Sequence, residues 1–226
     1  MIAIQKGMAM ALLAVGIVLA SLSNAQQEDQ AEMERDEGLP TKKQVVQLLF
    51  PCSFDMPSKQ EVENMNRVMS FGSPVLPVLG AILAERDDPL DVNRVLDVAS
   101  RIDGDKTPLL RELPALLKMP HWRIKVNAIK ALQRWGDVDD CKYILPLVST
   151  EEERVRLHAL RALGQLGNLS VASELEKVLT HHKTLVSAEK QKTDSTLKYG
   201  YRALSNIVER TATQHLEQTP DSSEDK

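Results

Sequence analysis

Two neighbouring segments of the chain carry cationic side chains at helical spacing. Arg123, Lys130 and Arg134 form the first group, and Arg154 and Arg161 form the second. At 100° per residue, each group falls within a narrow arc of one helix, roughly opposite its apolar positions. Cations in such an arc can bind carboxylates without any covalent step. The pattern predicts a basic stripe that binds an acidic partner; the alternative is that these side chains only solubilise an exposed helix.

Other residues that could do chemistry are sparse. The sequence contains no G-x-S-x-G, no H-E-x-x-H, no phosphate-binding glycine-rich loop and no C-x-x-C pair. His181 and His182 favour a solvated pair over a metal site, because adjacent ligands need a second pair that the sequence does not supply. Cys141 is expected in the core, whereas Cys52 could form an intermolecular bridge, since the two cysteines lie too many repeats apart to pair. We expect no catalytic residue, no metal and no cofactor.

The helices that position the cations belong to an internal repeat. Residues 123–137 superpose without a gap on residues 154–168, and glycines recur at 72, 104, 136 and 167, at intervals of 32, 32 and 31 residues. This period is typical of stacked helix pairs. Gly167 is expected to end its helix in the left-handed conformation. The apolar stripe of that helix, with a period of 3.6 residues, consists of Val155, Ala159, Ala162, Leu163 and Leu166.

A second amphipathic helix is expected after each glycine, over residues 75–83, 109–117, 141–148 and 171–179. Leu-Pro pairs at 113–114 and 145–146 place a proline at one repeated position, which predicts a shared kink. Residues 181–194 form an insertion that is expected to be a long loop and can carry binding.

Two further cations flank the apolar stripe instead of lying opposite it. Lys125 and Arg156 occupy this position in successive repeats. We expect them to form a structural ladder between repeats, with acidic residues such as Asp140 or Glu153 as partners.

The two ends of the chain differ from the repeats in composition. Residues 1–25 combine Lys6, an apolar run and a small-residue cleavage point after Ala25, as in a secretory signal peptide. An uncleaved membrane anchor is the alternative, but the apolar run is shorter than the roughly 20 residues that a spanning helix needs. The composition of residues 26–40 predicts an acidic disordered leader, which could compete in cis for the basic stripe. Residues 211–226 are predicted to form a disordered polar tail. The mature protein is therefore expected to be periplasmic or secreted, with no stable membrane span.

The repeat resembles the HEAT-like repeats, in particular the short variety described in phycobilisome lyases. The pattern V-R-x-x-A-x-x-A-L-G-x-[IL]-G-[DN] is matched almost completely at residues 155–168, well at 124–137, weakly at 92–105, and at 196–209 only after the insertion. The resemblance implies an all-α solenoid of about four to five helix pairs over residues 41–210. It also places the basic stripe on the concave side, where such arrays hold ligands.

Enzymes with this fold are also known, and the chain departs from them. Deoxyhypusine hydroxylase holds iron through His-Glu pairs, but no histidine of this chain is followed by Glu. Phycobilin lyases act in the cytoplasm, which the signal peptide argues against.

We therefore expect a non-enzymatic protein-binding or scaffolding module outside the cytoplasm. Its partner would be a protein or peptide of acidic character, and the formal net charge of -4 gives no support to nucleic acid. The alternative is a structural accessory subunit of an envelope enzyme or assembly.

Overall fold

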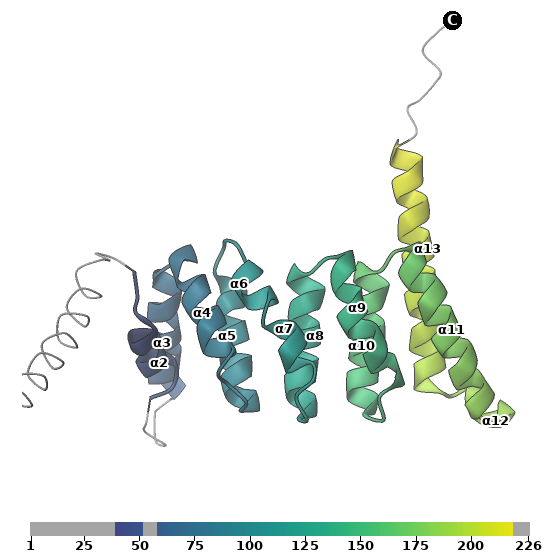
Figure 1. The fold of residues 1–226 in the computed structure, drawn as a ribbon, viewed down its shortest axis with the longest axis horizontal. Helices are drawn as coiled ribbons and strands as arrows, with labels where there is room; N and C mark the ends of the chain where they lie inside the picture. The colour runs from purple at the N-terminus through teal and green to yellow at the C-terminus, as the bar shows by residue number, and fades with distance from the viewer. Residues whose placement is uncertain (1–38, 52–57, 219–226) are drawn as a thin grey trace, which may run out of the picture. The chain divides into compact units, whose positions relative to one another are not determined.

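The repeat indicated by the glycine spacing folds into two layers of helices (Figure 1). The computed structural model describes residues 39–51 and 58–218. The chain divides into two compact units, Met1–Leu39 and Pro40–Lys226, and the helices from α2 to α13 belong to the second. The predicted signal peptide, the predicted leader up to residue 38, Cys52 and residues 219–226 of the predicted tail lie outside the described residues.

The first layer contains the helices that precede the repeated glycines, together with the last helix of the array. These are α3 (Ser58–Ser70), α5 (Pro89–Arg101), α8 (Trp122–Trp135), α10 (Glu153–Leu166) and α13 (Ser195–Gln218). The second layer contains α2 (Lys42–Leu49), α4 (Leu76–Leu83), α6 (Thr107–Leu110), α7 (Leu113–Leu116), α9 (Cys141–Ile144) and α11 (Leu169–Leu185). Short connections are η1 (Ser73–Val75), η2 (Val138–Asp140), η3 (Leu145–Ser149) and α12 (Ala188–Gln191).

Each helix of the array packs mainly against its neighbours within the layer and against its partner across the layers. The part of the chain that the structure describes contains no strand. In that same part, no helix has the length and apolar composition needed to cross a bilayer. The prediction of an all-α solenoid of helix pairs is confirmed.

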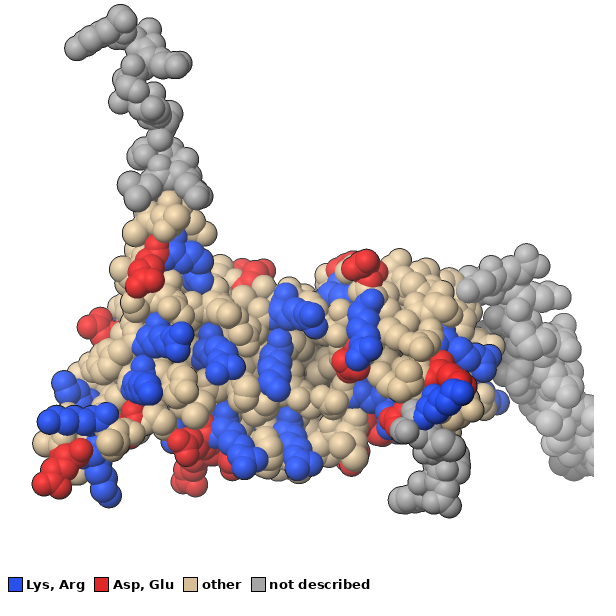
Figure 2. Space-filling model, turned by 180° about the vertical axis from the view of Figure 1, so that it is seen from behind, with Lys and Arg blue, Asp and Glu red and all other residues tan. Residues whose placement is uncertain are grey.

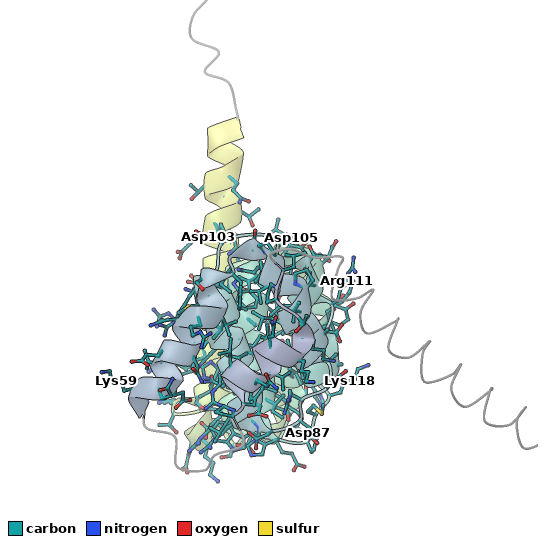
Figure 3. All side chains as sticks on the ribbon, turned by 90° about the vertical axis from the view of Figure 1, so that its left-hand side faces the viewer. Lys59, Asp87, Asp103, Asp105, Arg111 and Lys118 are labelled. Carbon is teal, nitrogen blue, oxygen red and sulfur yellow. The ribbon has the colours of Figure 1, made fainter. Side chains whose placement is uncertain are left out.

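The apolar stripe of each first-layer helix is buried between the layers. Val155, Ala159 and Leu163 of α10 are 0% exposed, and Ile124 and Leu132 of α8 are at most 1% exposed. Because burying a Val or Leu side chain is worth roughly 1.5–3 kcal/mol, the stripe sets the rotation of each helix about its axis. An end-on view shows side chains filling the space between the layers and charged residues around the outside (Figure 3); those labelled are Lys59, Asp87, Asp103, Asp105, Arg111 and Lys118.

Proline breaks two of the second-layer helices. The predicted helix at 109–117 is split into α6 and α7, and the one at 141–148 into α9 and η3. In both cases a new segment begins with a proline in its first turn, Pro114 or Pro146. The ring removes an N–H donor and clashes with the preceding turn. The kink expected at this repeated position is therefore a break in the helix.

Glycine ends α8 and α10 without a left-handed backbone, so the prediction of a left-handed Gly167 is wrong. Its φ is -63°, and the φ of Gly136 is -79°. A Cβ on Gly167 would lie 2.6 Å from the carbonyl oxygen of Leu163 and 3.0 Å from Cδ1 of Ile207. Any larger residue would therefore collide with its own helix and with α13. Within the described residues, positive φ occurs at Gly72 and Gly104.

Helix α13 runs beyond the end predicted for the repeats. A disordered tail was expected from Thr211, but the helix continues to Gln218. The hydroxyls of Thr211 and Thr213 donate to carbonyl oxygens one turn earlier, at 2.8 and 3.0 Å. The polar composition of this segment did not predict a helix. Forming the first turn of a helix is unfavourable, but the buried N-terminal half of α13 has already formed it, and each further residue then adds one hydrogen bond.

The insertion predicted as a loop at 181–194 is largely helical. Helix α11 continues to Leu185, and α12 occupies part of the remainder. His182 Nε2 lies 3.2 Å from Asp194 Oδ1, which also accepts the backbone N–H of Leu197 at 2.9 Å. Burial acts to raise the pKa of Asp194, but the hydrogen bonds from Leu197 and His182 outweigh it and hold that pKa below its usual value. Asp194 therefore ties the end of α11 to the start of α13.

Arg210 closes the C-terminal end of α10. Its guanidinium donates to the carbonyl oxygen of Gly164 at 3.2 Å, and also to those of Gln165 and Gly167. The last carbonyls of a helix have no partner within the helix, and a cation is favourable beside them. Helix α13 is thus joined to α10 by a polar contact as well as by apolar packing.

We expect Arg210→Ala to lower the free energy of unfolding by about 1–3 kcal/mol, because these carbonyls lose a charged donor. Urea denaturation followed by circular dichroism measures the change. Arg202→Ala, an exposed substitution on the same helix, is the matched control and should change stability by no more than about 0.5 kcal/mol. Equal denaturation midpoints for the two variants would contradict this role for Arg210.

The lowered pKa of Asp194 predicts acid sensitivity. Its contribution to stability is complete above the pKa of the unfolded state, near 3.9, and is lost as the pH falls through the lower pKa of the folded state. Between about pH 6 and pH 2.5 the wild type should therefore lose more stability than Asp194→Asn, whose amide oxygen can still accept from Leu197. Urea midpoints across this range test the prediction, and parallel curves for the two proteins would refute it.

Candidate functional site

The five cations predicted to form a stripe are all exposed on the first layer. Arg123, Lys130 and Arg134 project from α8, and Arg154 and Arg161 from α10. Lys and Arg side chains gather across the middle of this side of the array, over α8, α10 and α13 (Figure 2). Among the described residues, none of the five side chains has a hydrogen-bond or ion-pair partner. We call the surface formed by these five residues and Arg202 the basic face.

A cation occupies the same repeat position on three successive helices. Lys130, Arg161 and Arg202 each precede an Ala-Leu pair whose alanine is buried, and all three are exposed. Because the buried alanine sets the helix rotation, the three cations project from equivalent points of α8, α10 and α13. Arg202 is not among the residues that the sequence predicted for the stripe. The pair Ala203-Leu204 in the last copy of the repeat could have identified it, because Arg202 precedes that pair as Lys130 and Arg161 precede theirs.

Two adjoining hollows lie on the basic face beside α10. One, of about 260 Å³, lies between α10 and α13 and is lined by residues that include Arg161, Gln165, Tyr199, Arg202 and Asn206. The other, of about 210 Å³, is lined by Trp122, Arg154, Leu157, His158, Arg161 and Tyr199. Arg161 and Tyr199 line both hollows, and neither lining contains Asp or Glu. The pair of hollows therefore combines aromatic surface with unneutralised positive charge.

Trp122 positions two of the predicted cations. The guanidinium carbon of Arg154 lies 4.6 Å from the indole centroid, and that of Arg123 lies 5.3 Å from it. Cation–π contacts at this distance are attractive, and a stacked guanidinium keeps its in-plane N–H groups free for a carboxylate. Helix α8 begins at a cap that lies beside Trp122, since His121 Nδ1 accepts the backbone N–H of Arg123 at 3.2 Å.

His158 lines one of the two hollows, and its pKa responds to burial and to the cations of the basic face. Burial lowers the pKa of His158, and the nearby cations Lys130 and Arg161 lower it further. The imidazole is therefore neutral at neutral pH. It can accept a hydrogen bond from a bound partner and adds no further repulsion to the cluster.

Arg156 donates to hydroxyl and carbonyl oxygens, not to the carboxylates expected for the ladder. Its Nε donates to Thr196 Oγ1 at 2.7 Å, and its Nη1 donates to the carbonyl oxygens of Thr150 at 2.6 Å and Glu151 at 3.3 Å. Carbonyl and hydroxyl oxygens at a helix junction need a donor, and an arginine fork satisfies several at once. Arg156 therefore links α10 to the start of α13 without an acidic partner.

The acidic residues expected in this ladder are used elsewhere. Asp140 Oδ2 accepts the backbone N–H of Asp137 at 3.0 Å, and Glu153 Oε1 accepts from the Ser195 hydroxyl at 2.6 Å. Lys125 is half-buried and makes no ion pair with any described residue. Carboxylate partners were expected for Lys125 and Arg156, and this expectation is wrong for Asp140 and Glu153.

The remaining reactive side chains do not form a second site. Cys141 is free and 2% exposed, as expected for a core residue, and burial raises the pKa of its thiol to about 11. A thiol of this pKa stays protonated and is a poor nucleophile. Within residues 39–51 and 58–218, no three His, Cys, Asp or Glu side chains come together as a metal site.

Comparison with known proteins agrees with this geometry. Residues 109–192, from α6 to the end of the insertion, match the family model of HEAT repeats. No curated protein shows a significant match to the chain. Arrays of this kind generally mediate protein–protein interaction or scaffolding and are typically non-enzymatic. With its two helical layers and its repeat of about 32 residues, the chain forms an all-α solenoid of helix pairs, and its central part is similar to HEAT repeats.

Proposed function

We propose that this protein is a non-enzymatic binding module that holds an acidic partner protein on its basic face, outside the cytoplasm. The observation that carries the proposal is the row of exposed cations on α8, α10 and α13 that lack intramolecular partners among the described residues. Carboxylates of a partner would supply the missing acceptors.

Five described arginines are engaged within the array, whereas Arg67 and Arg111, like the arginines of the basic face, are exposed without a hydrogen-bond or ion-pair partner among the described residues. Away from the basic face, Arg86, Arg94 and Arg101 pair with acidic side chains, and Arg156 and Arg210 donate to carbonyl oxygens. On the basic face, Arg154 and Arg161 border hollows whose linings contain no carboxylate. The basic face differs from the positions of Arg67 and Arg111 because its cations gather together beside aromatic hollows (Figure 2), and this grouping supports a binding role.

The expected mode of binding is cumulative. A single exposed ion pair contributes only about 0–1 kcal/mol, so a useful affinity requires several pairs together with apolar contact. Charge of one sign on a face also accelerates association with an acidic partner, and salt weakens both effects. The expected partner is therefore an acidic segment that spans more than one repeat.

We predict that reversing the five cations, by changing Arg123, Lys130, Arg134, Arg154 and Arg161 together to Glu, abolishes capture of the partner. In-cell crosslinking followed by pull-down measures this loss, and circular dichroism verifies that the helical content is unchanged. The partner should be lost because five attractive contacts become repulsive.

A matched control reverses five exposed cations of the second layer, namely Lys43, Arg111, Lys118, Lys142 and Lys177. This control changes the net charge equally but leaves the basic face intact, so it should retain the partner. If both variants capture the same proteins as the wild type, the basic face serves only solubility.

The location of the protein is a separate part of the proposal. It rests on the charged, apolar and small-residue order of residues 1–25, which is that of a cleaved secretory signal. We expect the purified mature protein to begin at Gln26. N-terminal sequencing tests this directly, and an intact Met1 in the membrane fraction would instead support an anchor.

A further inference from the structure

We propose that the segment bound on the basic face is an acidic chain in the polyproline II conformation, with a carboxylate at every third residue, lying across α8, α10 and α13. This inference rests on the proposed function and specifies its ligand. It follows from the repeat register of the cations, from the aromatic hollow between them and from the amide side chains beside them.

The spacing of the cations selects the conformation of the ligand. Lys130, Arg161 and Arg202 occupy equivalent positions on three consecutive packed helices, and packed helix axes lie about 8–10 Å apart. A polyproline II chain returns to the same face every three residues and advances about 3.1 Å per residue, which gives about 9.3 Å between like side chains. A β-strand returns to the same face after about 6.7 Å and would fall out of register. Carboxylates at i, i+3 and i+6 therefore meet the three cations in turn.

The hollow beside Arg161 accommodates the residues between the carboxylates. Trp122, Leu157 and Tyr199 give it apolar and aromatic walls, and its volume is about 210 Å³. Aromatic-lined grooves bind proline-rich segments well, because a preformed polyproline II helix loses little entropy on binding. We therefore expect proline or another apolar residue between successive acidic positions.

The amide side chains beside the cations can bond to a peptide backbone. Gln165 and Asn206 follow Arg161 and Arg202 by four residues, and both are exposed in the hollow between α10 and α13. Gln165 Oε1 accepts from Gln133 Nε2, and its own amide N–H groups remain as donors. An amide both donates and accepts hydrogen bonds. The backbone carbonyls of a polyproline II chain have no internal partner, so they can accept hydrogen bonds from these amides.

The test compares two heptapeptides of identical composition and charge. Glu-Pro-Pro-Glu-Pro-Pro-Glu carries carboxylates at the proposed spacing, and Glu-Glu-Glu-Pro-Pro-Pro-Pro carries them in a cluster. Each has a fluorescein label at its N-terminus and an amidated C-terminus, and binding to the full-length protein is measured by anisotropy. The spaced peptide should bind at least about threefold more tightly, since the clustered one loses one or two of its ion pairs.

A second readout places the peptide on the surface. The chain has two tryptophans, so in a Trp135→Phe background all indole emission comes from Trp122. The spaced peptide should change this emission with the same midpoint as the anisotropy. An unchanged emission at saturation would place the peptide elsewhere and overturn the proposal.

A charge-matched pair of variants tests the cation row. Lys130, Arg161 and Arg202 are changed together to Gln, and the control changes Lys118, Lys177 and Arg111, which are exposed cations of the second layer. The first variant should bind the spaced and clustered peptides equally weakly, and the control should retain the threefold preference. A preference that survives in the first variant would overturn the assignment of these three residues.

Other outcomes separate this inference from the broader proposal. If both peptides bind equally but only the first variant is weakened, the register is refuted while an acidic partner on the basic face stands. If neither peptide binds at about 1 mM, the polyproline II ligand is refuted, and the crosslinking experiment alone decides the proposed function. An oligothymidylate of equal charge that binds more tightly than the spaced peptide would assign the face to polyanions instead.

Discussion

Burial of one apolar stripe per helix is the constraint on which the rest of this structure depends. A single amphipathic helix pair cannot bury its stripe alone, so each repeat must be covered by the next one, and contacts run between neighbours. Small residues let the neighbours approach. A Cβ on Gly164 of α10 would lie 3.0 Å from Cα of Ala203 on α13, so these two helices cross almost backbone to backbone.

The same constraint produces the basic face without any contact between its members. Because Ala131, Ala162 and Ala203 are buried at equivalent positions, the residues before them project in equivalent directions, and all three are exposed. The chain places Lys130, Arg161 and Arg202 at that position in three consecutive repeats. A repetitive core therefore generates a repetitive surface, and the distance between packed helices sets the spacing that a ligand must match.

Arginines of α10 and α13 have two different roles, linking helices or projecting from the basic face. At helix ends, Arg156 and Arg210 meet carbonyl oxygens that have no partner within their helix, so each joins two elements. In the middle of a helix the carbonyls are already bonded, and Arg161 finds no acceptor among the described residues. Trp122 then becomes important, because its ring holds Arg154 near the face without neutralising it.

The sequence by itself determined the repeat, the buried stripe and the exposure of the predicted cations, because each depends on a periodicity within one helix. It did not determine that Arg156 bonds to Thr196, that Tyr199 and Trp122 line one hollow, or that Gly167 is needed for space and not for a left-handed backbone. The first two features, and the contact of Gly167 with Ile207, join residues 40 or more positions apart, and their geometry depends on how helices pack across the insertion. Local periodicity predicts which side of a helix faces the core, and only the packed tertiary structure decides which side chains meet on the other side.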